Sequence, residues 1–281
     1  MKKNNILILS AGRRVELVQD FQAEAAKFSD GTKILCTDLN PKMSSACQAA
    51  DGAFAVPRIS APDYIDSIFE LAQAQNIGLI IPTIDTELLK LADARARFAV
   101  AGIQIVVADS ALIRQCRDKR DTIALFTRHG IASPEIYAPD NITFPCFAKP
   151  YDGSRGIGAQ ALNNPEALTD ELKHDPKMMF CQLIDIQHTF KEFTVDMYYS
   201  HEGRLKCAVP RERLEVRSGE VSKGATRRDW LYDFLLEKMA VLEGARGCFT
   251  AQFFYHAESR SVYGVEINPR FGGGFPLTYA A

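Results

Sequence analysis

The 281-residue sequence lacks the features that mark membrane-spanning, secreted and zinc-binding proteins. No apolar run approaches the roughly 20 residues that a membrane-spanning helix needs. The first apolar segment, residues 6–9, is too short for a signal peptide and is soon followed by Arg13 and Arg14, so we predict a buried strand there. The seven cysteines are scattered and form no C-x-x-C pair. We therefore expect reduced, buried thiols in a cytoplasmic protein, and no zinc site.

Two common nucleotide-binding motifs and a strong charge of either sign are also missing. The net charge is −2, which gives no reason to expect nucleic acid or an anionic membrane as a partner. Neither the G-x-x-x-x-G-K-S/T phosphate loop nor the G-x-G-x-x-G dinucleotide fingerprint occurs. The length nevertheless allows two domains, or one domain with a mobile lid.

The first 112 residues alternate short apolar runs with amphipathic stretches. The predicted buried strands cover residues 6–9, 33–37, 54–56, 79–81 and 103–107. One helical stripe runs from Val18 to Phe28, and a second helix begins after Pro62 and Asp63. This alternation predicts a Rossmann-like parallel sheet with helices on both faces. Residues 10–14 and 82–87 follow two of these strands, where open parallel sheets place their ligands.

The remaining residues predict a second module of a different kind. A helix is predicted to begin at Ser110, to carry Asp118 and Lys119, and to end at Gly130. Strands separated by turns follow from about residue 133, with one further helix over residues 229–243. The predicted strands cover residues 146–148, 178–182, 192–199, 205–209, 248–256 and 261–267. Antiparallel strands after an α/β unit indicate an α+β module.

Three oxygen-bearing side chains are predicted to meet on the last two strands. Glu266 and Asn268 are two residues apart, so both leave the same face of a strand, roughly 7 Å apart. A connecting loop of three or five residues would place Gln252 opposite Glu266 on that face. Such a patch suits Mg²⁺, and Arg270 beyond it could stabilise a phosphoryl group. Taken alone, these residues are explained better by a solvated hairpin with a polar face that ends at a proline turn.

Weaker signals precede this hairpin. Three glycines within residues 153–158 would let backbone N–H groups approach phosphate oxygens, and Lys149 ends a predicted strand just before them. Glu192 shares a strand face with Asp196 and could accept hydrogen bonds from ribose hydroxyls. Residues 203–228 carry eight basic side chains against three glutamates, which suits an anionic ligand. Singly, each is explained as well by a glycine-rich turn, a half-buried strand with a solvated face, or a solvated basic surface.

The order of these residues resembles the ATP-grasp fold, most closely the stand-alone proteins similar to the large subunit of carbamoyl phosphate synthetase. Biotin carboxylase and D-alanine–D-alanine ligase are more distantly similar. The resemblance covers nearly the whole chain and implies an α/β plus α+β architecture. It implies a Rossmann-like pre-ATP-grasp domain over residues 1–112, a linker helix and mobile lid over 113–190, and a C-terminal ATP-grasp subdomain over 191–281.

The resemblance also implies roles for single residues. Lys119 and Lys149 would bind the ATP phosphates, and a lid loop with Ser154, Gly156 and Gly158 would cover them. The adenine pocket would be formed by Gln182, Leu183 and Ile184, and the carboxylate of Glu192 would bind the ribose. Gln252, Glu266 and Asn268 would bind Mg²⁺, with Mn²⁺ as an alternative. Arg270 and Lys223 would be the catalytic cations.

These roles imply an ATP-dependent carboxylate–amine ligase. A small-molecule acid would be phosphorylated to an acyl phosphate, which an amine would then attack without a protein nucleophile. The expected partners are these two small molecules, with neither nucleic acid nor membrane, and relatives of this architecture are commonly homodimers. Two alternatives stay open: an ATP-binding regulatory or scaffold protein that has lost catalysis, and a Rossmann oxidoreductase.

The chain departs from the family pattern in three places. Gln182 stands where members usually have glutamate. Gln252 stands where many have an acidic metal ligand, although the carbamoyl phosphate synthetase halves also use glutamine. The chain stops at Ala281, soon after Gly272–Gly274, whereas relatives continue. We therefore expect a C-terminally short module, natural or truncated, whose acid and amine the sequence does not name.

Overall fold

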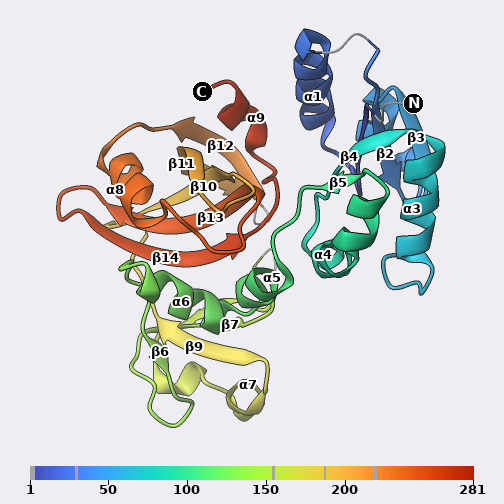
Figure 1. Cartoon of the computed structure of the whole chain (residues 1–281). Helices are drawn as coiled ribbons and strands as arrows, with labels where there is room; N and C mark the ends of the chain where they lie inside the picture. Colours follow the sequence, from blue (N-terminus) through green and yellow to red (C-terminus); the bar gives the residue numbers. More distant parts are fainter. Residues whose placement is uncertain (1–3, 29–30, 154–155, 187, 218–219) are drawn as a thin grey trace.

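The computed structural model describes residues 4–28, 31–153, 156–186, 188–217 and 220–281, and these residues form three sheets in three lobes (Figure 1). A parallel sheet forms the N-terminal lobe, drawn in blue to cyan. A five-stranded antiparallel sheet, mostly orange and red, forms the second lobe, and a four-stranded antiparallel sheet forms the third. The expected α/β plus α+β class is confirmed. None of the helices in the described ranges combines the length and apolarity that a bilayer crossing needs.

The N-terminal sheet has the strand order β3-β2-β1-β4-β5, with every pair parallel. Its strands are β1 (Asn5–Ile8), β2 (Ile34–Asp38), β3 (Gly52–Ala55), β4 (Ile77–Ile81) and β5 (Gln104–Ile105). The strand order reverses between β1 and β4, because β2 leads away from β1 on one side and β4 on the other. The carboxyl ends of these two central strands therefore border the crevice where open α/β sheets bind ligands.

Helices cover both faces of this sheet, as predicted. They are α1 (Val15–Phe28), α2 (Ser45–Ala49), α3 (Tyr64–Ala74) and α4 (Asp85–Val100), with a 3-10 turn at Pro41–Met43. Leu7 and Leu9 belong to the same core cluster as residues of α3 and α4, whereas Ile8 packs in another with residues of α1 and α2. Alternate side chains of one strand thus enter opposite cores. The predicted stripe of α1 is wrong at Phe28, which ends the helix and is 85% exposed.

Asp118 divides the single helix predicted over residues 110–130 into two. α5 spans Ser110–Arg117 and α6 spans Lys119–Arg128. Asp118 has extended backbone angles, and its carboxylate accepts a hydrogen bond from the Arg120 N–H at 2.9 Å. It is therefore the N-cap of α6, and the prediction of one continuous helix is wrong. The break places Lys119 at the first position of a new helix.

The two antiparallel sheets follow. The smaller has the order β6-β9-β7-β8 and the larger β12-β11-β10-β13-β14. The smaller lobe contains β6 (Ile136–Tyr137), β7 (Cys146–Pro150), β8 (Gln160–Leu162), a 3-10 turn (Pro165–Ala167), α7 (Asp170–His174) and β9 (Met178–Gln182). The larger contains β10 (Lys191–Tyr199), β11 (Leu205–Arg217), β12 (Glu220–Thr226), α8 (Trp230–Lys238), β13 (Gly247–His256), β14 (Ser261–Asn268) and α9 (Phe275–Tyr279). The sequence patterns miss β6, β8 and β12, which are edge strands with little apolar patterning.

A β-bulge sets the register of the last hairpin. His256 pairs with Ser261, so the connecting loop has four residues rather than the three or five expected. A regular hairpin of that length would turn Glu266 away from Gln252. The register shifts between Gln252 and Phe253: Phe253 pairs with Gly264, and Val265 is left without an opposite residue. The shift makes Gln252 and Glu266 direct partners, so the predicted pairing is confirmed although its predicted cause is wrong.

All seven cysteines are free thiols, and six of them are buried. The expectation of buried, reduced thiols therefore holds except at Cys207, which is exposed on β11. Burial raises the pKa of several of these thiols, to about 12 for Cys36.

Candidate functional site

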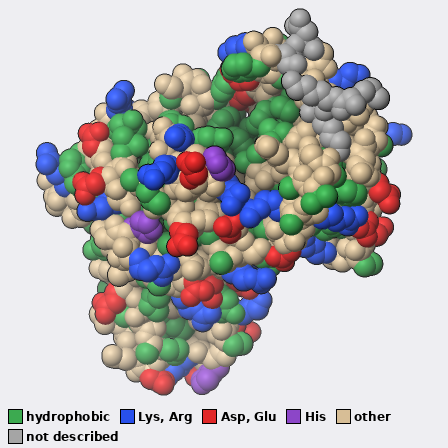
Figure 2. Space-filling view, viewed as in Figure 1, with side chains coloured by type: hydrophobic (Ala, Val, Ile, Leu, Met, Phe, Trp, Pro, Cys, Tyr) green, Lys and Arg blue, Asp and Glu red, His purple; other side chains and the backbone are tan. Residues whose placement is uncertain are grey.

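A cleft of about 820 Å³ lies where the N-terminal lobe, the α5–α6 segment and the larger antiparallel sheet meet. Figure 2 shows the molecular surface hollowed between the lobes. The lining comes from the loops after β1 and β4, from α5 and the start of α6, and from one face of the larger sheet. It includes six residues in or near the predicted ATP site: Lys119, Gly153, Gln252, Glu266, Asn268 and Arg270.

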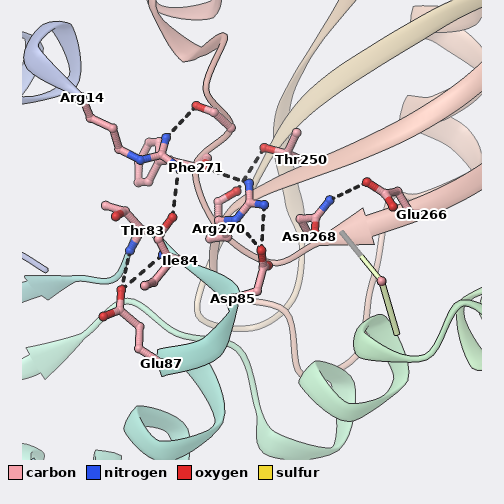
Figure 3. A network of polar contacts seen from close by, with 12 residues as sticks. Arg14, Thr83, Ile84, Asp85, Glu87, Thr250, Glu266, Asn268, Arg270 and Phe271 are labelled. Atoms are coloured by element: carbon pink, nitrogen blue, oxygen red, sulfur yellow. Dashed lines mark hydrogen bonds and ion pairs between the residues drawn. The ribbon is translucent and has the colours of Figure 1, made fainter. Parts of the chain in front are cut away.

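The terminal hairpin directs its oxygen-bearing side chains into this cleft. Gln252 pairs with Glu266, and Thr250 pairs with Asn268, so all four side chains lie on one face. Asn268 Nδ2 donates a hydrogen bond to Glu266 Oε1 at 3.1 Å (Figure 3). The second oxygen, Glu266 Oε2, lies 3.9 Å from Lys119 Nζ. The hairpin face is therefore a wall of the cleft, and not the solvated surface that the alternative interpretation required.

Lys119 holds its ammonium group inside the cleft. The Nζ atom donates a hydrogen bond to the Gly153 carbonyl at 2.5 Å, and the side chain is only 12% exposed. Burial lowers the pKa of Lys119; Glu266 opposes this, and the positive charge of Lys149 adds to it. Two lysines close enough to repel each other, with a single carboxylate near Lys119, favour the binding of a further anion.

Arg270 reaches from the hairpin to the N-terminal lobe. Its Nη2 and Nε lie 2.8 and 3.1 Å from Asp85 Oδ2 (Figure 3). Asp85 is the first residue of α4, so this ion pair joins the two lobes across one end of the cleft. Thr250 Oγ1 lies 3.0 Å from the Arg270 carbonyl oxygen and helps to hold the segment after β14.

Arg14 links the same two lobes a second time. Its Nη1 donates to the Gly272 carbonyl and its Nη2 to the Thr83 carbonyl, both at 3.0 Å. Burial lowers the pKa of Arg14 to about 10, and the positive charge of Arg270 contributes. The ionisable residues of the cleft lining are mostly basic: Arg13, Arg14, Arg117, Lys119, Arg211, Arg213 and Arg270 against Glu16, Asp85, Asp152 and Glu266. The cleft is therefore suited to anionic ligands.

Glu87 fixes the two strand-end loops beneath Arg14. One carboxylate oxygen accepts the backbone N–H groups of Thr83 and Ile84, at 2.8 and 3.2 Å. The other accepts the hydroxyls of Ser10 and Tyr64, at 2.8 and 2.9 Å. Burial raises the pKa of Glu87, while these donors act in the opposite direction. These hydrogen bonds hold the loop after β4 in one conformation.

Other residues predicted for the site lie outside the cleft lining. Gly156 and Gly158 follow β7 with left-handed backbones, while Gln182 ends β9 and leads into Leu183 and Ile184. Lys149 lies on β7, outside the lining but near enough to Lys119 to affect its pKa. Ser154 lies outside the described residues.

Glu192 and Lys223 are both engaged in ion pairs. Glu192 Oε1 lies 2.8 Å from Arg213 Nη1, and burial raises the pKa of Glu192 despite this partner. The negative charge of Glu266 contributes to the same increase. Lys223 is 68% exposed on β12, with Nζ 2.7 Å from Glu215 Oε2. The structure therefore leaves Lys223 at the surface, outside the cleft.

The sequence patterns miss a buried ion pair at the cleft. Asp196 was expected on a solvated strand face, yet it and Arg211 are each 2% exposed, with 2.7 Å between Oδ2 and Nη1. The expectation is wrong because the chain after β14 covers this face: Thr278 donates to Asp196, and the Gly274 carbonyl accepts from Arg211. Only the excess of arginines in residues 203–228 hinted at it, and nothing local indicated the cover.

Comparison with known families identifies both ends of the chain. Residues 6–106 match the model for the PylC-like N-terminal domain, and residues 176–281 match the model described as ATP-grasp in the biosynthetic pathway with Ter operon. The chain is an ATP-grasp protein. The resemblance stated from the sequence is thereby confirmed.

The ATP-grasp protein also matches known proteins at low identity. It is 24% identical over 249 residues to a carbamoyl-phosphate synthase of Methanobrevibacter smithii. The match covers 82% of this chain and 66% of that relative, so the chain spans about two thirds of the relative's length. Its fold matches biotin carboxylase of Campylobacter jejuni with a TM-score of 0.73 (16% identity, 99% of this chain and 67% of that chain). It matches L-amino acid ligase of Bacillus licheniformis with a TM-score of 0.72 (14% identity, 99% and 70%).

The donor set of this ATP-grasp protein suits a metal–nucleotide complex better than a lone metal ion. Within the described part of the chain, no cluster of three or more His, Cys, Asp or Glu side chains is arranged to bind a metal. The hairpin offers the carboxylate of Glu266 beside the amide oxygens of Gln252 and Asn268. Mg²⁺ held by so few carboxylates takes phosphate oxygens as further ligands. The neighbouring ammonium of Lys119 suits those phosphates.

Proposed function

We propose that this protein is an ATP-dependent ligase that activates a small-molecule carboxylate as an acyl phosphate and joins it to an amine. The observation that carries this proposal is one cleft in which phosphate-binding, metal-binding and anion-stabilising side chains meet, namely Lys119, Gln252, Glu266, Asn268 and Arg270. The names of two relatives, a carbamoyl-phosphate synthase and an L-amino acid ligase, support the formation of a C–N bond.

In the first step, a carboxylate oxygen attacks the γ-phosphorus of ATP, and the bond from that phosphorus to the β,γ-bridging oxygen breaks to release ADP. Two anions must approach each other, so charge neutralisation and positioning dominate the catalysis. Mg²⁺, or Mn²⁺ in its place, would be held by Gln252, Glu266 and Asn268 and would neutralise phosphate charge. Lys119 and Lys149 would bind the phosphates, and Arg270, oriented by Asp85, would stabilise the transferring group.

In the second step, the amine nitrogen attacks the acyl carbon, the acyl–phosphate C–O bond breaks, and phosphate leaves as the nitrogen loses a proton. Acyl phosphates hydrolyse readily, so water has to be kept out between the steps. The ion pair of Arg270 with Asp85 and the bonds of Arg14 close one end of the cleft. The loop carrying Gly156 and Gly158 is proposed to cover the other.

Some assignments stay proposals that rest on the family pattern. Gln182, Leu183 and Ile184 would surround the adenine, and Glu192 would bind the ribose after releasing Arg213. Lys223 would act in catalysis only after its ion pair with Glu215 opens. The division of the chain at residues 112 and 190 into a pre-ATP-grasp domain, a lid and a C-terminal subdomain is proposed in the same way.

The test is an assay of ADP release with a matrix of carboxylic acids and amines, combined with calorimetric measurement of Mg-ATP binding. The double variant Glu266→Gln/Asn268→Ala should lose at least about 10²-fold in turnover, because the metal ligands are gone, and keep its melting temperature. Glu258→Gln, exposed in the turn of the same hairpin, is the matched control. ATP binding without turnover for every pair would indicate a regulatory protein. Full activity in the double variant would refute the assignment.

A further inference from the structure

Arg211 is a buried arginine on the wall of the cleft, away from the proposed metal end. It lies on β11 opposite Thr194, which in turn pairs with Gln252, which pairs with Glu266. These four residues form one row across four neighbouring strands. Strands lie about 4.8 Å apart, so the backbones of Arg211 and Glu266 are separated by roughly 14 Å. Arg211 therefore extends from a strand that is three strands away from the one carrying Glu266.

Among the described residues, every polar contact of the Arg211 side chain is made by one of its three nitrogens. Nη1 lies 2.7 Å from Asp196 Oδ2, 2.6 Å from the Gly274 carbonyl oxygen and 2.6 Å from Thr278 Oγ1. The Nε atom is buried and has no hydrogen-bond partner among the described residues. The whole side chain is only 2% exposed, and Arg211 lines the cleft. A buried guanidinium with one edge unpaired is incomplete without a ligand.

The unpaired edge matches a carboxylate. A buried N–H without a partner is destabilising, and a ligand that accepts its hydrogen bond removes that penalty. The Nε–Nη2 edge of a guanidinium presents two parallel N–H groups, a spacing that fits the two oxygens of a carboxylate. Asp196 fixes the opposite side of the guanidinium and is itself held by Thr250 and Thr278. The arginine is thus held rigidly before any ligand binds.

The glycine at position 274 lies against the face of the Arg211 guanidinium, and not along its unpaired edge. A Cβ atom there would lie 2.8 Å from Arg211 Cζ and Nη2 and 3.0 Å from Nε, which is closer than such atoms approach. The backbone of Gly274 has φ −93°, which any residue can adopt. The glycine is therefore required by the space beside the guanidinium, not by the backbone.

We propose that Arg211 binds a second, non-reacting carboxylate of a substrate, an inference that rests on the proposed ligase function. That carboxylate belongs either to the acid, which is then a dicarboxylic acid, or to the amine, which is then an amino acid. In both cases Arg211 selects the substrate and holds it at the end of the molecule remote from the phosphoryl transfer.

The experiment compares paired substrates that differ only in the remote carboxylate. One arm sets dicarboxylic acids against their monoamides, with hydroxylamine as the nucleophile. The other sets L-amino acids against their amides, with each acid that supports ADP release. The wild-type protein should prefer the carboxylate in one arm only, and that arm identifies its source.

Arg211→Lys keeps the charge and removes the two-pronged edge. It should reduce kcat/KM for the carboxylate substrate about 10- to 100-fold, as the loss of a charge-assisted pair predicts. It should leave both kcat/KM for the amide substrate and the KM for ATP within twofold of the wild-type values. Gly274→Ala, whose Cβ would displace the guanidinium from its position against this glycine, should give the same selective loss. Arg204→Lys, exposed just before β11, is the control.

The outcomes separate this inference from the proposed function. Turnover by the wild-type protein that ignores the remote carboxylate in both arms would overturn the inference and leave the ligase standing. The same holds if Arg211→Lys and Gly274→Ala slow carboxylate and amide substrates equally or raise the KM for ATP. Absence of turnover with every pair would refute the proposed function, and the inference with it.

Discussion

At the scale of single residues, this protein uses buried charged groups to hold loops in place. Glu87 and Arg211 are buried and Arg14 is half-buried, and each contacts segments that are distant in sequence. Charged groups are buried only when other groups satisfy most of their hydrogen bonds. Their partners here are largely backbone N–H and carbonyl groups of the loops around the cleft. The hydrogen bonds that offset the free-energy cost of burying these charges therefore also hold the loops of the site in place.

Glu87 gives a prediction for stability. Glu87→Ala leaves the N–H groups of Thr83 and Ile84 without partners and should lower the free energy of unfolding by about 1–3 kcal/mol for each. Glu87→Gln should cost less, because its amide oxygen can still accept both N–H groups while the hydroxyls of Ser10 and Tyr64 turn to accept from its NH₂. Urea unfolding measures both effects, and a Glu87→Ala variant as stable as wild type would contradict the account.

The same position has a predicted pH dependence. Burial raises the pKa of Glu87 above its ordinary 4.5, so folding favours the protonated form. That contribution is fully present below pH 4.5 and is lost as the pH rises through the raised pKa. The stability of Glu87→Gln relative to wild type should therefore improve as the pH rises from 4.5 towards neutrality. A constant or opposite difference across that range would show that Glu87 titrates normally or with a lowered pKa.

At the scale of elements, the contact between α6 and β14 sets the geometry of the metal end. A Cβ atom on Gly264 would lie 2.4 Å from Phe126 Cδ2, so Gly264→Ala forces these elements apart. We expect a loss of about 1–3 kcal/mol in the free energy of unfolding, as overpacking predicts. Phe126→Leu should restore part of that loss in the double variant, because leucine lacks the ring edge. Additive effects of the two substitutions in urea unfolding would contradict a direct contact.

The elements also show what a single sequence can indicate. The predicted range 178–182 coincides with β9, and the paired final strands were found because their apolar residues repeat regularly. The break at Asp118 was missed because an aspartate fits both a helix interior and an N-cap. The bulge at Val265 was missed because strand periodicity alone does not fix the loop length. Asp196 and Arg211 were missed because their cover comes from Gly274 and Thr278, far along the chain.

The candidate site could be predicted at the positions where a motif names a residue type. Lys119, Gln252, Glu266, Asn268 and Arg270 were expected together, and they meet in one cleft. Asp85 and Arg14 lay in segments that the sequence marked as strand ends, yet their partners were not predictable. Those partners belong to another lobe, and the relative position of lobes is a property of tertiary packing.

At the scale of the whole molecule, the N-terminal lobe orients a proposed catalytic side chain of the C-terminal lobe. Asp85→Asn removes the charge that holds Arg270. We expect kcat to fall about 10- to 100-fold, the loss of a charge-assisted hydrogen bond, while the KM for Mg-ATP stays within twofold. Asp85→Glu should recover part of the rate, and Glu70→Gln, exposed on α3, should change neither constant. A rise in the KM for ATP at unchanged kcat would assign Asp85 to nucleotide binding instead.

The central claim is that the cleft transfers the γ-phosphoryl group of ATP to a carboxylate. The most direct measurement uses the acid that supports the fastest ADP release, labelled with ¹⁸O in its carboxyl group, together with Mg-ATP and the matching amine. Mass spectrometry of the released phosphate should find one ¹⁸O atom in each molecule, because the acyl C–O bond breaks when the amine attacks. Unlabelled phosphate, formed at the rate of ADP release, would mean that water is the acceptor and would contradict the account.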